Sequence, residues 1–378
     1  MRYLFIIQGE GRGHLTQALT LKDFLTSKGH EVVEMLVGKS ANRSLPPFFE
    51  KEAGVPVKMF LSPNFLPSSN HKRNSIFRSV VYNLHCLPQY IKSVSFINSR
   101  INNTKADIVV NFYELLCGFA YGLFAPGIPC YCIGHQYLFL HKDFNISHIK
   151  RRNLLLLNFF SRMTSIGCSR RLALSFHEME SDESLKISVV PPLLRREVLK
   201  LNPSKSDFIL GYMVNPGFAD EVREYHSANP QISMCFFWDK KNEPDELIED
   251  ENLLFKQIDD KAFLDKMASC RAYATTAGFE SVCEAIYLGK PVLMVPAHIE
   301  QDCNAYDAEA IGAGVVSKEF DFDKLVGSLN DYQENKEFQT WAKKSEYRIL
   351  PLLKPRQLNI ERHISKNRAR ILRFINMN

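Results

Sequence analysis

Short apolar runs alternate with amphipathic stretches along most of the chain. In the first half these runs have the length of buried strands; they cover residues 2–7, 31–37, 107–110, 128–133 and 186–190. Between the first two runs, Leu15, Ala18 and Leu19 recur at helical spacing, which predicts a helix over residues 14–28. A further helix is predicted over residues 115–124, between the third and fourth runs.

A second series of strands and helices begins after Pro191-Pro192. Its apolar runs cover residues 208–214, 232–237, 253–258, 272–276 and 291–295, with helical stretches between them. Strands that alternate with helices form parallel sheets covered on both faces, so the fold class is α/β with two doubly wound sheets. The two prolines predict a stiff connector between domains. We therefore expect an N-terminal domain over 1–192, a second domain over 193–340 and a C-terminal tail over 341–378.

Size and composition narrow the class of protein. The chain has 378 residues, 45% of them hydrophobic and 24% charged, which is typical of a folded globular protein and not of a disordered one. No apolar run reaches the ~18–20 residues of a membrane-spanning helix, and residues 2–7 are too short for the core of a signal peptide. Nine scattered cysteines fit reduced thiols, so we expect a cytoplasmic location.

The charge is unevenly distributed. Residues 1–190 carry 22 Lys/Arg against 13 Asp/Glu, residues 191–340 carry 15 against 27, and residues 341–378 carry 10 against 2. The basic tail is predicted to be helical from Asn359 and to pack back on the N-terminal domain. Two long stretches, 54–105 and 144–177, contain no acidic residue. They are either solvated surface or a face that meets an anionic acceptor or membrane leaflet. We expect no nucleic-acid partner, because no recognised binding module accompanies the charge.

The glycine loop after the first strand, Gly9-Glu10-Gly11-Arg12-Gly13, is not a dinucleotide-binding motif. Its third glycine is misplaced for G-x-G-x-x-G, and no acidic residue ends the second strand. The loop instead lets a substrate approach the backbone closely and presents His14 at a helix start. A helix N-terminus lowers the pKa of a histidine and keeps it neutral, as a general base requires. A purely structural histidine in the turn is the alternative.

The most informative stretch runs from Thr275 to Ala305 and predicts strand, glycine turn, helix, strand, polar loop and helix. Ligands bind at the carboxyl ends of strands in such sheets, and a helix that begins at Gly278 would hold an anion such as a diphosphate. Glu284 and the Glu300-Gln301 pair would line the same crevice. This layout suits a nucleotide sugar. The alternatives are a solvated helix glutamate and an ordinary polar loop.

These two segments resemble the glycosyltransferases of the GT-B fold, which include the N-acetylglucosaminyltransferases of family 28 and the UDP-sugar transferases of family 1. The resemblance implies two Rossmann-like domains that face a cleft, with a C-terminal helix returning to the N-terminal domain. It implies that Glu284 binds the donor ribose, that the backbone at Ala277, Gly278 and Phe279 holds the diphosphate, and that Glu300 and Gln301 contact the transferred sugar. The full donor-binding set that we predict is Gly11, Gly13, Asn215, Gly217, Ile258, Thr276, Ala277, Gly278, Phe279, Ser281, Glu284, Glu300, Gln301 and Asn304.

Two departures from the families' patterns qualify the resemblance. Thr276 stands where plant family 1 enzymes have a histidine, which shifts the likeness toward family 28. A third segment, residues 107–114, resembles a bacterial group related to family 28, although Phe112 replaces its usual aspartate. Through it we predict Glu114 as a second catalytic residue beside His14, and His135 and Gln136 on the acceptor side. A structural role for His135 stays open.

Together these patterns predict a glycosyltransferase that moves a sugar from a UDP-linked donor to an acceptor hydroxyl, with inversion and without a metal or cofactor. Asp321-Phe322-Asp323 is expected to start a helix and is not assigned to a metal. The acceptor would be lipid-linked or anionic, with membrane contact through the basic domain and tail. The alternatives are a UDP-sugar epimerase or hydrolase, a non-catalytic nucleotide-sugar-binding protein, and a membrane-surface or nucleic-acid binder.

Overall fold

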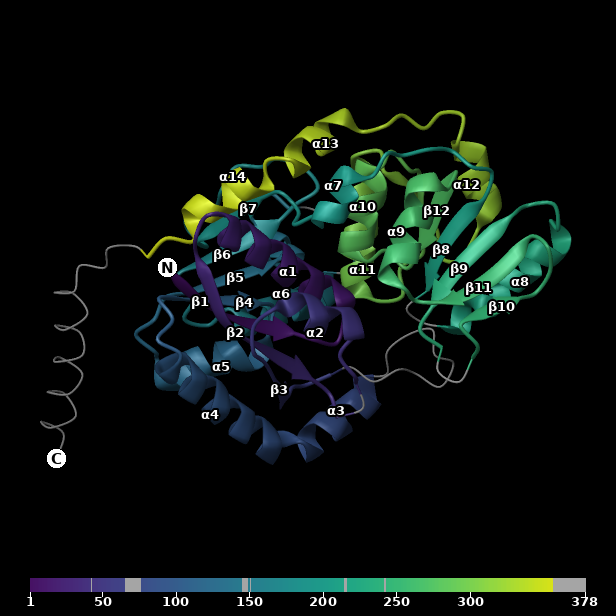
Figure 1. Cartoon of the computed structure of the whole chain (residues 1–378). Helices are drawn as coiled ribbons and strands as arrows, with labels where there is room; N and C mark the ends of the chain where they lie inside the picture. The colour runs from purple at the N-terminus through teal and green to yellow at the C-terminus, as the bar shows by residue number, and fades with distance from the viewer. Residues whose placement is uncertain are drawn as a thin grey trace, which may run out of the picture.

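The computed structural model describes residues 1–41, 43–64, 76–144, 149, 151–213, 216–240 and 243–355. These residues form two lobes, each built on a seven-stranded sheet with helices on both faces (Figure 1). Two doubly wound sheets are therefore present, as the alternating pattern predicts.

The first sheet has the strand order β3-β2-β1-β4-β5-β6-β7, and all its strands are parallel. The strands are β1 (Arg2–Gln8), β2 (Glu31–Lys39), β3 (Val57–Leu61), β4 (Ile108–Phe112), β5 (Cys130–Gly134), β6 (Arg170–Leu174) and β7 (Ile187–Val190). Helices α1 (Arg12–Ser27) and α2 (Pro47–Ala53) cover one face. Helices α4 (Leu87–Asn103), α5 (Leu115–Phe124) and α6 (Arg151–Thr164) cover the other, with α3 (Ile76–His85) against α4. Right-handed crossovers on either side of β1 require this division.

The second sheet has the order β10-β11-β9-β8-β12-β13-β14, with only the edge strand β10 antiparallel. Its strands are β8 (Ile209–Met213), β9 (Met234–Trp238), β10 (Glu246–Ile248), β11 (Leu253–Gln257), β12 (Ala272–Thr275), β13 (Val292–Met294) and β14 (Gly314–Val316). Its helices are α8 (Ala219–Ala228), α9 (Asp260–Ser269), α10 (Phe279–Tyr287), α11 (Ile299–Ala310) and α12 (Phe322–Ser328). As expected, Asp321 starts a helix: its side chain caps α12 by accepting from the Lys324 N–H at 3.0 Å.

Each sheet reverses its strand order at one point, between β1 and β4 in the first and between β8 and β12 in the second. At these points one non-glycine residue per sheet adopts a left-handed backbone. Tyr113 follows β4 with φ 59°, and Ala277 follows β12 with φ 61°. Such strained conformations cluster at functional sites, and ligands of open α/β sheets bind at these switch points. The backbone alone therefore places the candidate site at the two carboxyl edges.

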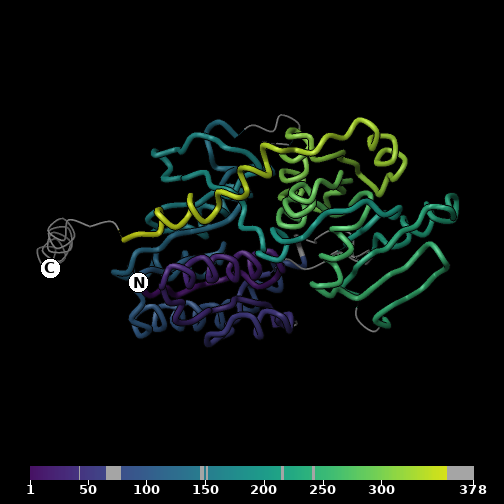
Figure 2. The backbone as a smooth tube through the Cα atoms, turned by 45° about the horizontal axis from the view of Figure 1, so that its top comes forward, coloured from purple at the N-terminus to yellow at the C-terminus, as the bar shows by residue number. Residues whose placement is uncertain are grey.

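The chain passes between the lobes twice. Pro191-Pro192 and α7 (Arg196–Lys200) lie between the last strand of the first sheet and the first strand of the second. After α12, the helices α13 (Lys336–Ala342), α14 (Ser345–Ile349) and η3 (Leu350–Leu352) run back over the first lobe (Figure 2). There the Trp341 indole N–H donates to the Ser175 carbonyl at 3.0 Å, and the Tyr3 hydroxyl donates to the Leu353 carbonyl at 3.2 Å. The helix predicted from Asn359 lies outside the described residues.

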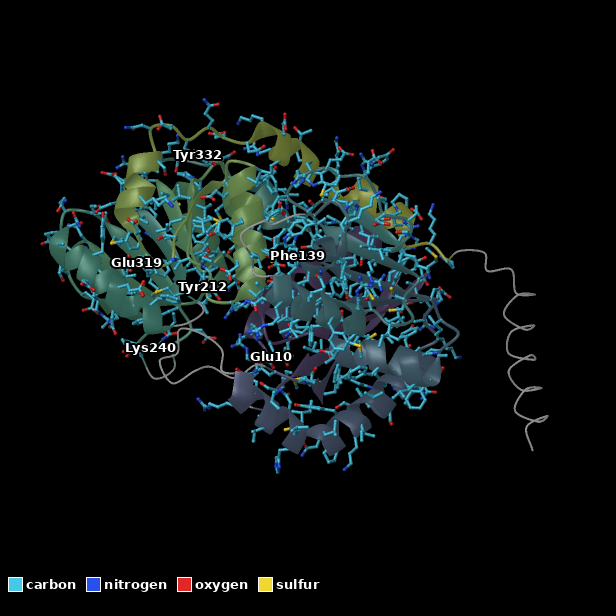
Figure 3. All side chains as sticks on the ribbon, turned by 180° about the vertical axis from the view of Figure 1, so that it is seen from behind. Glu10, Phe139, Tyr212, Lys240, Glu319 and Tyr332 are labelled. Carbon is cyan, nitrogen blue, oxygen red and sulfur yellow. The ribbon has the colours of Figure 1, made fainter. Side chains whose placement is uncertain are left out.

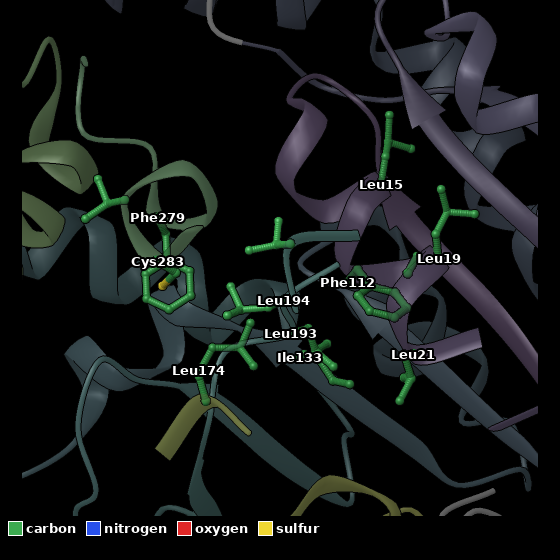
Figure 4. Close-up of a cluster of buried hydrophobic side chains, with 14 of the residues drawn as sticks. Leu15, Leu19, Leu21, Phe112, Ile133, Leu174, Leu193, Leu194, Phe279 and Cys283 are labelled. Carbon is green, nitrogen blue, oxygen red and sulfur yellow. The ribbon is translucent and has the colours of Figure 1, made fainter. Parts of the chain in front are cut away.

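One apolar core joins the two lobes. Phe279 and Cys283 of α10 belong to the same cluster of buried side chains as Leu174, Leu193 and Leu194 of the first lobe and the connector (Figure 4). Burial of this surface holds the lobes in direct contact. All nine cysteines are buried and free, as the sequence predicts for reduced thiols. None of the described helices combines the length and the apolar character needed to cross a bilayer.

Candidate functional site

The carboxyl edges of the two sheets meet at the glycine loop of the first lobe and the start of α10 in the second. Gly11 is the N-cap of α1 and Gly278 is the N-cap of α10. Gly13 faces the Glu280 carboxylate so closely that a β-carbon at this position would clash with it. Figure 3 shows Glu10 of the same loop at the boundary between the lobes, with Tyr212 on the opposite lobe. Gly13, one of the glycines predicted for the donor site, thus lies where the two lobes touch.

His14 occupies the third helical position of α1 and is hydrogen-bonded through Gln17 to the other lobe. Its Nδ1 lies 3.2 Å from the Gln17 side-chain oxygen, and the Gln17 amide nitrogen donates to Glu280. Because an amide oxygen only accepts, Nδ1 carries the proton and Nε2 keeps its lone pair. The imidazole ring also stacks on Tyr113, with ring centroids 5.8 Å apart. Nε2 is thus the basic atom of this histidine.

A second contact across the lobes lies beside His14. The Gln136 amide nitrogen donates to Glu300 Oε1 at 2.8 Å and lies 3.5 Å from His14 Nε2. Gln136 is in η1 (His135–Leu140), directly after β5, and Glu300 is in the first turn of α11. His14, Gln17, Gln136, Glu280 and Glu300 therefore form one polar chain that bridges the lobes.

Enclosure by both lobes changes the protonation of this chain. Burial lowers the pKa of His14 to about 4, so the imidazole is neutral at pH 7. Burial, with a contribution from neighbouring carboxylates, raises the pKa of Glu280 to about 7. Burial likewise raises the pKa of Glu300 to about 7. At pH 7 the imidazole therefore has a free lone pair, and the two carboxyls titrate near neutral pH, as perturbed groups at functional sites do.

Glu284, the residue predicted to bind ribose, is almost fully buried on α10 and paired with an arginine. Its two carboxylate oxygens accept from Arg195 Nε at 2.6 Å and Nη2 at 2.8 Å. Asp260 lies 3.5 Å from the same guanidinium and accepts from Arg12 of the glycine loop at 3.1 Å. The two hydrogen bonds fix the plane of the Glu284 carboxylate.

The start of α10 has the features of an anion site. Gly278 caps the helix without a side-chain bond, so the first backbone N–H groups point out of the helix end. Ser281 donates to the Gly278 carbonyl at 3.2 Å, and the Asn304 amide donates to the Ala277 carbonyl at 3.1 Å. Among the described residues, Thr276 Oγ1 and Asn304 Oδ1 have no hydrogen-bond partner.

Gln301 faces the backbone with its oxygen, which accepts from the Ala297 N–H at 2.9 Å. Gly217 lies in η2 (Pro216–Phe218), Ile258 follows β11 and packs on the core, and Asn215 lies outside the described residues. The donor-binding roles of these residues stay predictions.

Glu114 and His135 lie deeper than the cleft surface. Glu114 caps α5, and its Oε1 accepts from the Ser62 hydroxyl at 2.7 Å and from the Leu116 N–H at 3.0 Å. Among the described residues, the side chains beside His14 are Gln17, Gln136 and Tyr113, so Glu114 does not orient His14 directly in this structure. His135 Nδ1 bonds the Leu174 carbonyl at 2.7 Å, and its ring stacks on Phe279 at 4.0 Å. These contacts agree with the structural alternative for His135, while both residues' catalytic and acceptor roles stay predictions.

Three residues of this site, Gln17, Arg195 and Glu280, are not among those predicted from the sequence. Gln17 lies one turn after His14 on the same face of α1, a spacing that could have indicated it. Glu280 stands in the first turn of α10, where an acidic residue is ordinary. Arg195 follows the connector, and no local pattern links it to Glu284. Among the described residues, no group of three or more His, Cys, Asp or Glu side chains could hold a metal ion.

Comparisons with known proteins agree with this architecture. A family model described as glycosyl transferase family 1 matches residues 1–331. No curated protein matches the chain.

Solved structures with a similar fold include the glycotransferase of kitacinnamycin, with TM-score 0.60, 15% identity, and coverage of 92% of this chain and 95% of that chain. The calicheamicin glycosyltransferase CalG4 has TM-score 0.56 and 15% identity over 92% of this chain and 95% of its own. Arabidopsis thaliana UGT89C1 complexed with UDP-L-rhamnose has TM-score 0.58 and 15% identity, over 92% of this chain and 94% of its own. These matches confirm the predicted fold, and the family model supports the family 1 part of the resemblance.

Proposed function

The chain belongs to glycosyl transferase family 1 and is a glycosyltransferase of the GT-B type, and on this basis we propose that it transfers a sugar from a UDP-linked donor to an acceptor hydroxyl with inversion. The observation that carries the proposal is the placement of His14 Nε2 beside Gln136 and Glu300, across from the start of α10. A base on one lobe and an anion site on the other are the two parts that an inverting transfer needs.

In the proposed reaction His14 Nε2 accepts the proton of the acceptor hydroxyl. The hydroxyl oxygen forms a bond to the anomeric carbon while the bond from that carbon to the diphosphate oxygen breaks. The free N–H groups of α10 stabilise the charge that develops on the departing diphosphate. Because the attacking and leaving oxygens lie on opposite sides of the anomeric carbon, the configuration inverts. No step of this scheme calls on a metal ion, so we propose that transfer persists in the presence of EDTA.

Glu284 can serve the ribose while it stays paired with Arg195. A carboxylate offers about four lone-pair positions, and the two hydrogen bonds from Arg195 use two of them. The remaining two suit the vicinal hydroxyls of a ribose. We therefore assign Arg195 as a positioning residue that orients the Glu284 carboxylate.

Glu280 stands beside the proposed diphosphate position. An ionised carboxylate at this place repels the diphosphate, whereas a protonated carboxyl donates a hydrogen bond to it. The raised pKa of Glu280, about 7, makes the protonated form accessible near neutral pH. We propose that the donor binds to protonated Glu280 and replaces its contact with Gln17.

The choice of a UDP-linked donor is supported by the donor motif and by the fold shared with a protein whose structure was solved with UDP-L-rhamnose. A thermal-shift panel of UDP-, GDP-, ADP-, CMP- and TDP-sugars tests it. A UDP-sugar should raise the unfolding temperature more than the other donors. Stabilisation by a different nucleotide would correct the base, and the absence of any stabilisation would remove the donor site.

We also propose a cytoplasmic location, which the nine buried free thiols support.

Incubation with the stabilising donor alone separates a transferase from a hydrolase or epimerase on the same fold. A transferase should turn over little donor until an acceptor is added.

A further inference from the structure

One face of the first lobe exposes an unusual share of large apolar side chains. Fifteen such side chains are exposed among the described residues, and ten of them belong to the helices α3 to α6. The ten are Val80, Val81, Leu84, Leu87, Ile91, Leu123, Phe124, Leu155, Leu156 and Phe159. Singly scattered exposed apolar residues are ordinary, but a concentration over a few neighbouring helices marks an interaction surface.

These side chains form stripes along the helices. Val80, Val81 and Leu84 on α3 have the spacing i, i+1, i+4, and Leu155, Leu156 and Phe159 on α6 repeat it. Residues at this spacing share one face of a helix. Because α4 packs on α3 and α5, and α5 packs on α6, the four helices form one continuous layer over the first sheet. We call this layer's exposed side the α3–α6 face.

The charged side chains of the α3–α6 face are predominantly positive. Arg78, Lys92, Arg152 and Arg162 are exposed on the same helices. The sequence stretches 54–105 and 144–177, which contain α3, α4 and α6, have no acidic residue at all. Helices with exposed apolar stripes and flanking basic residues are typical of surfaces that lie on anionic bilayers.

We propose that the α3–α6 face docks onto the surface of an anionic lipid membrane. Its apolar stripes would enter the boundary between headgroups and acyl chains, and its basic side chains would pair with the headgroup phosphates. A folded protein partner would instead need acidic groups matched to this one face. The basic charge without interspersed acids therefore favours the bilayer.

The α3–α6 face also reaches the reaction centre. Phe160, next to Phe159 on α6, lies with its ring 5.7 Å from that of Tyr113, whose ring stacks on His14 at 5.8 Å. A docked leaflet would lie beside the acceptor side of the cleft. This consequence rests on the proposed function and favours an amphiphilic acceptor drawn from the leaflet.

Flotation of the full chain with lipid vesicles tests the docking. Vesicles of phosphatidylcholine mixed with phosphatidylglycerol should carry the protein, and vesicles of phosphatidylcholine alone should carry much less. The double variant Leu156→Ser/Phe159→Ser should lower binding by about tenfold or more, since it removes apolar anchors. The charge variant Lys92→Glu/Arg152→Glu should lower it by a similar factor and weaken its salt dependence.

The matched control is Ile248→Ser/Tyr347→Ser, which removes two equally exposed apolar side chains from other elements. It should bind as the wild type does. The proposal is overturned if the wild type binds neither vesicle, or if the α6 and charge variants bind as well as the control. It is also overturned if the wild type is a dimer that the α6 variant dissociates, because a second copy then covers the face. Donor binding is measured on the same variants without vesicles, so its loss would be seen separately as a failure of the proposed function.

Discussion

Arg195 holds the Glu284 carboxylate by two hydrogen bonds, from Nε at 2.6 Å and from Nη2 at 2.8 Å. Arg195 follows the connector between the lobes, and Glu284 lies on α10, whose first turn faces the glycine loop. A single bidentate ion pair thus links the segment directly after the connector to Glu284, the residue proposed to bind the donor ribose. Because only a planar guanidinium supports this geometry, lysine is not an equivalent replacement.

Arg195→Lys should therefore weaken donor binding more than it slows the chemical step. We expect the KM for the UDP-sugar to rise by about tenfold, the effect of about 1.4 kcal/mol of lost orientation, with a smaller change in kcat. Steady-state kinetics with the donor varied would measure this. Arg196→Lys is the control, since the neighbouring arginine contacts Asp23 and lies away from Glu284. A fall in kcat at unchanged KM would show that Arg195 acts in the transition state instead.

His14→Ala should abolish transfer and spare donor binding. Loss of a general base costs about 10²–10⁴ in rate, whereas the donor contacts on α10 stay intact. Transfer assays report the first quantity, and calorimetric titration with the UDP-sugar reports the second. His30→Ala, beyond the opposite end of α1, should leave both unchanged. Loss of both quantities, or of neither, in His14→Ala would contradict the role of His14 as the base.

Donor affinity should fall as the pH rises through about 7, the pKa to which burial raises Glu280. Below that pH Glu280 is protonated and donates a hydrogen bond to the diphosphate beside it. Above it, binding must first return a proton to the carboxylate, so affinity falls by up to about tenfold per pH unit. Titration of the protein with a UDP-sugar at pH values between 6 and 9 would measure this slope.

Glu280→Gln should flatten that slope and bind the donor about as tightly at high pH as at low pH, because glutamine carries no charge. Glu319→Gln, an exposed glutamate of the same lobe, should keep the wild-type slope. If Glu280→Gln kept the slope of the wild type, the titration would belong to another group. Glu300 would be the first candidate, because burial also raises its pKa to about 7.

Phe279→Ala should destabilise the contact between the lobes. The Phe279 ring stacks on His135 at 4.0 Å and packs on Phe176 at 4.7 Å, all three almost fully buried. Truncation of a buried phenylalanine lowers the free energy of unfolding by about 3–5 kcal/mol. Urea unfolding would measure it against Phe124→Ala, whose ring is exposed and whose loss should cost little. An equal, small effect of both variants would mean that the core does not run across the lobes.

Much of the fold follows from local patterns in the sequence. The apolar runs predict ten of the strands, and the helices at residues 14–28 and 115–124 lie within one or two residues of α1 and α5. The four strands that were missed lack such a pattern. β6 opens with Arg170 and Arg171, whose charges are satisfied by Glu183 and by the Leu185 carbonyl, and β10 and β14 have three residues each. β3 lies at the sheet edge, where Lys58 interrupts the apolar run and only Phe60 is buried.

The residues of the site likewise include some that local sequence patterns predict and others that only the fold brings together. His14 and the start of α10 could be predicted because a glycine loop and a glycine turn mark strand ends in any sequence. The hydrogen bond between Gln17 and Glu280 could not be predicted, since 263 residues separate them and only the contact between the lobes brings them together. Arg195 and Glu284 are likewise 89 residues apart. Interactions of this kind depend on how the lobes meet, which no periodicity encodes.

The most direct test of the donor site is calorimetric titration of the stabilising UDP-sugar into the wild type and into Glu284→Gln. The glutamine keeps the shape of Glu284 but loses its charge and one acceptor oxygen, so the fold can be checked by circular dichroism on the same sample. We predict measurable binding by the wild type and at least about tenfold weaker binding by the variant, the cost of a lost charged hydrogen bond. Equal affinity in the two proteins, or no binding by a wild type that is folded, would contradict the account.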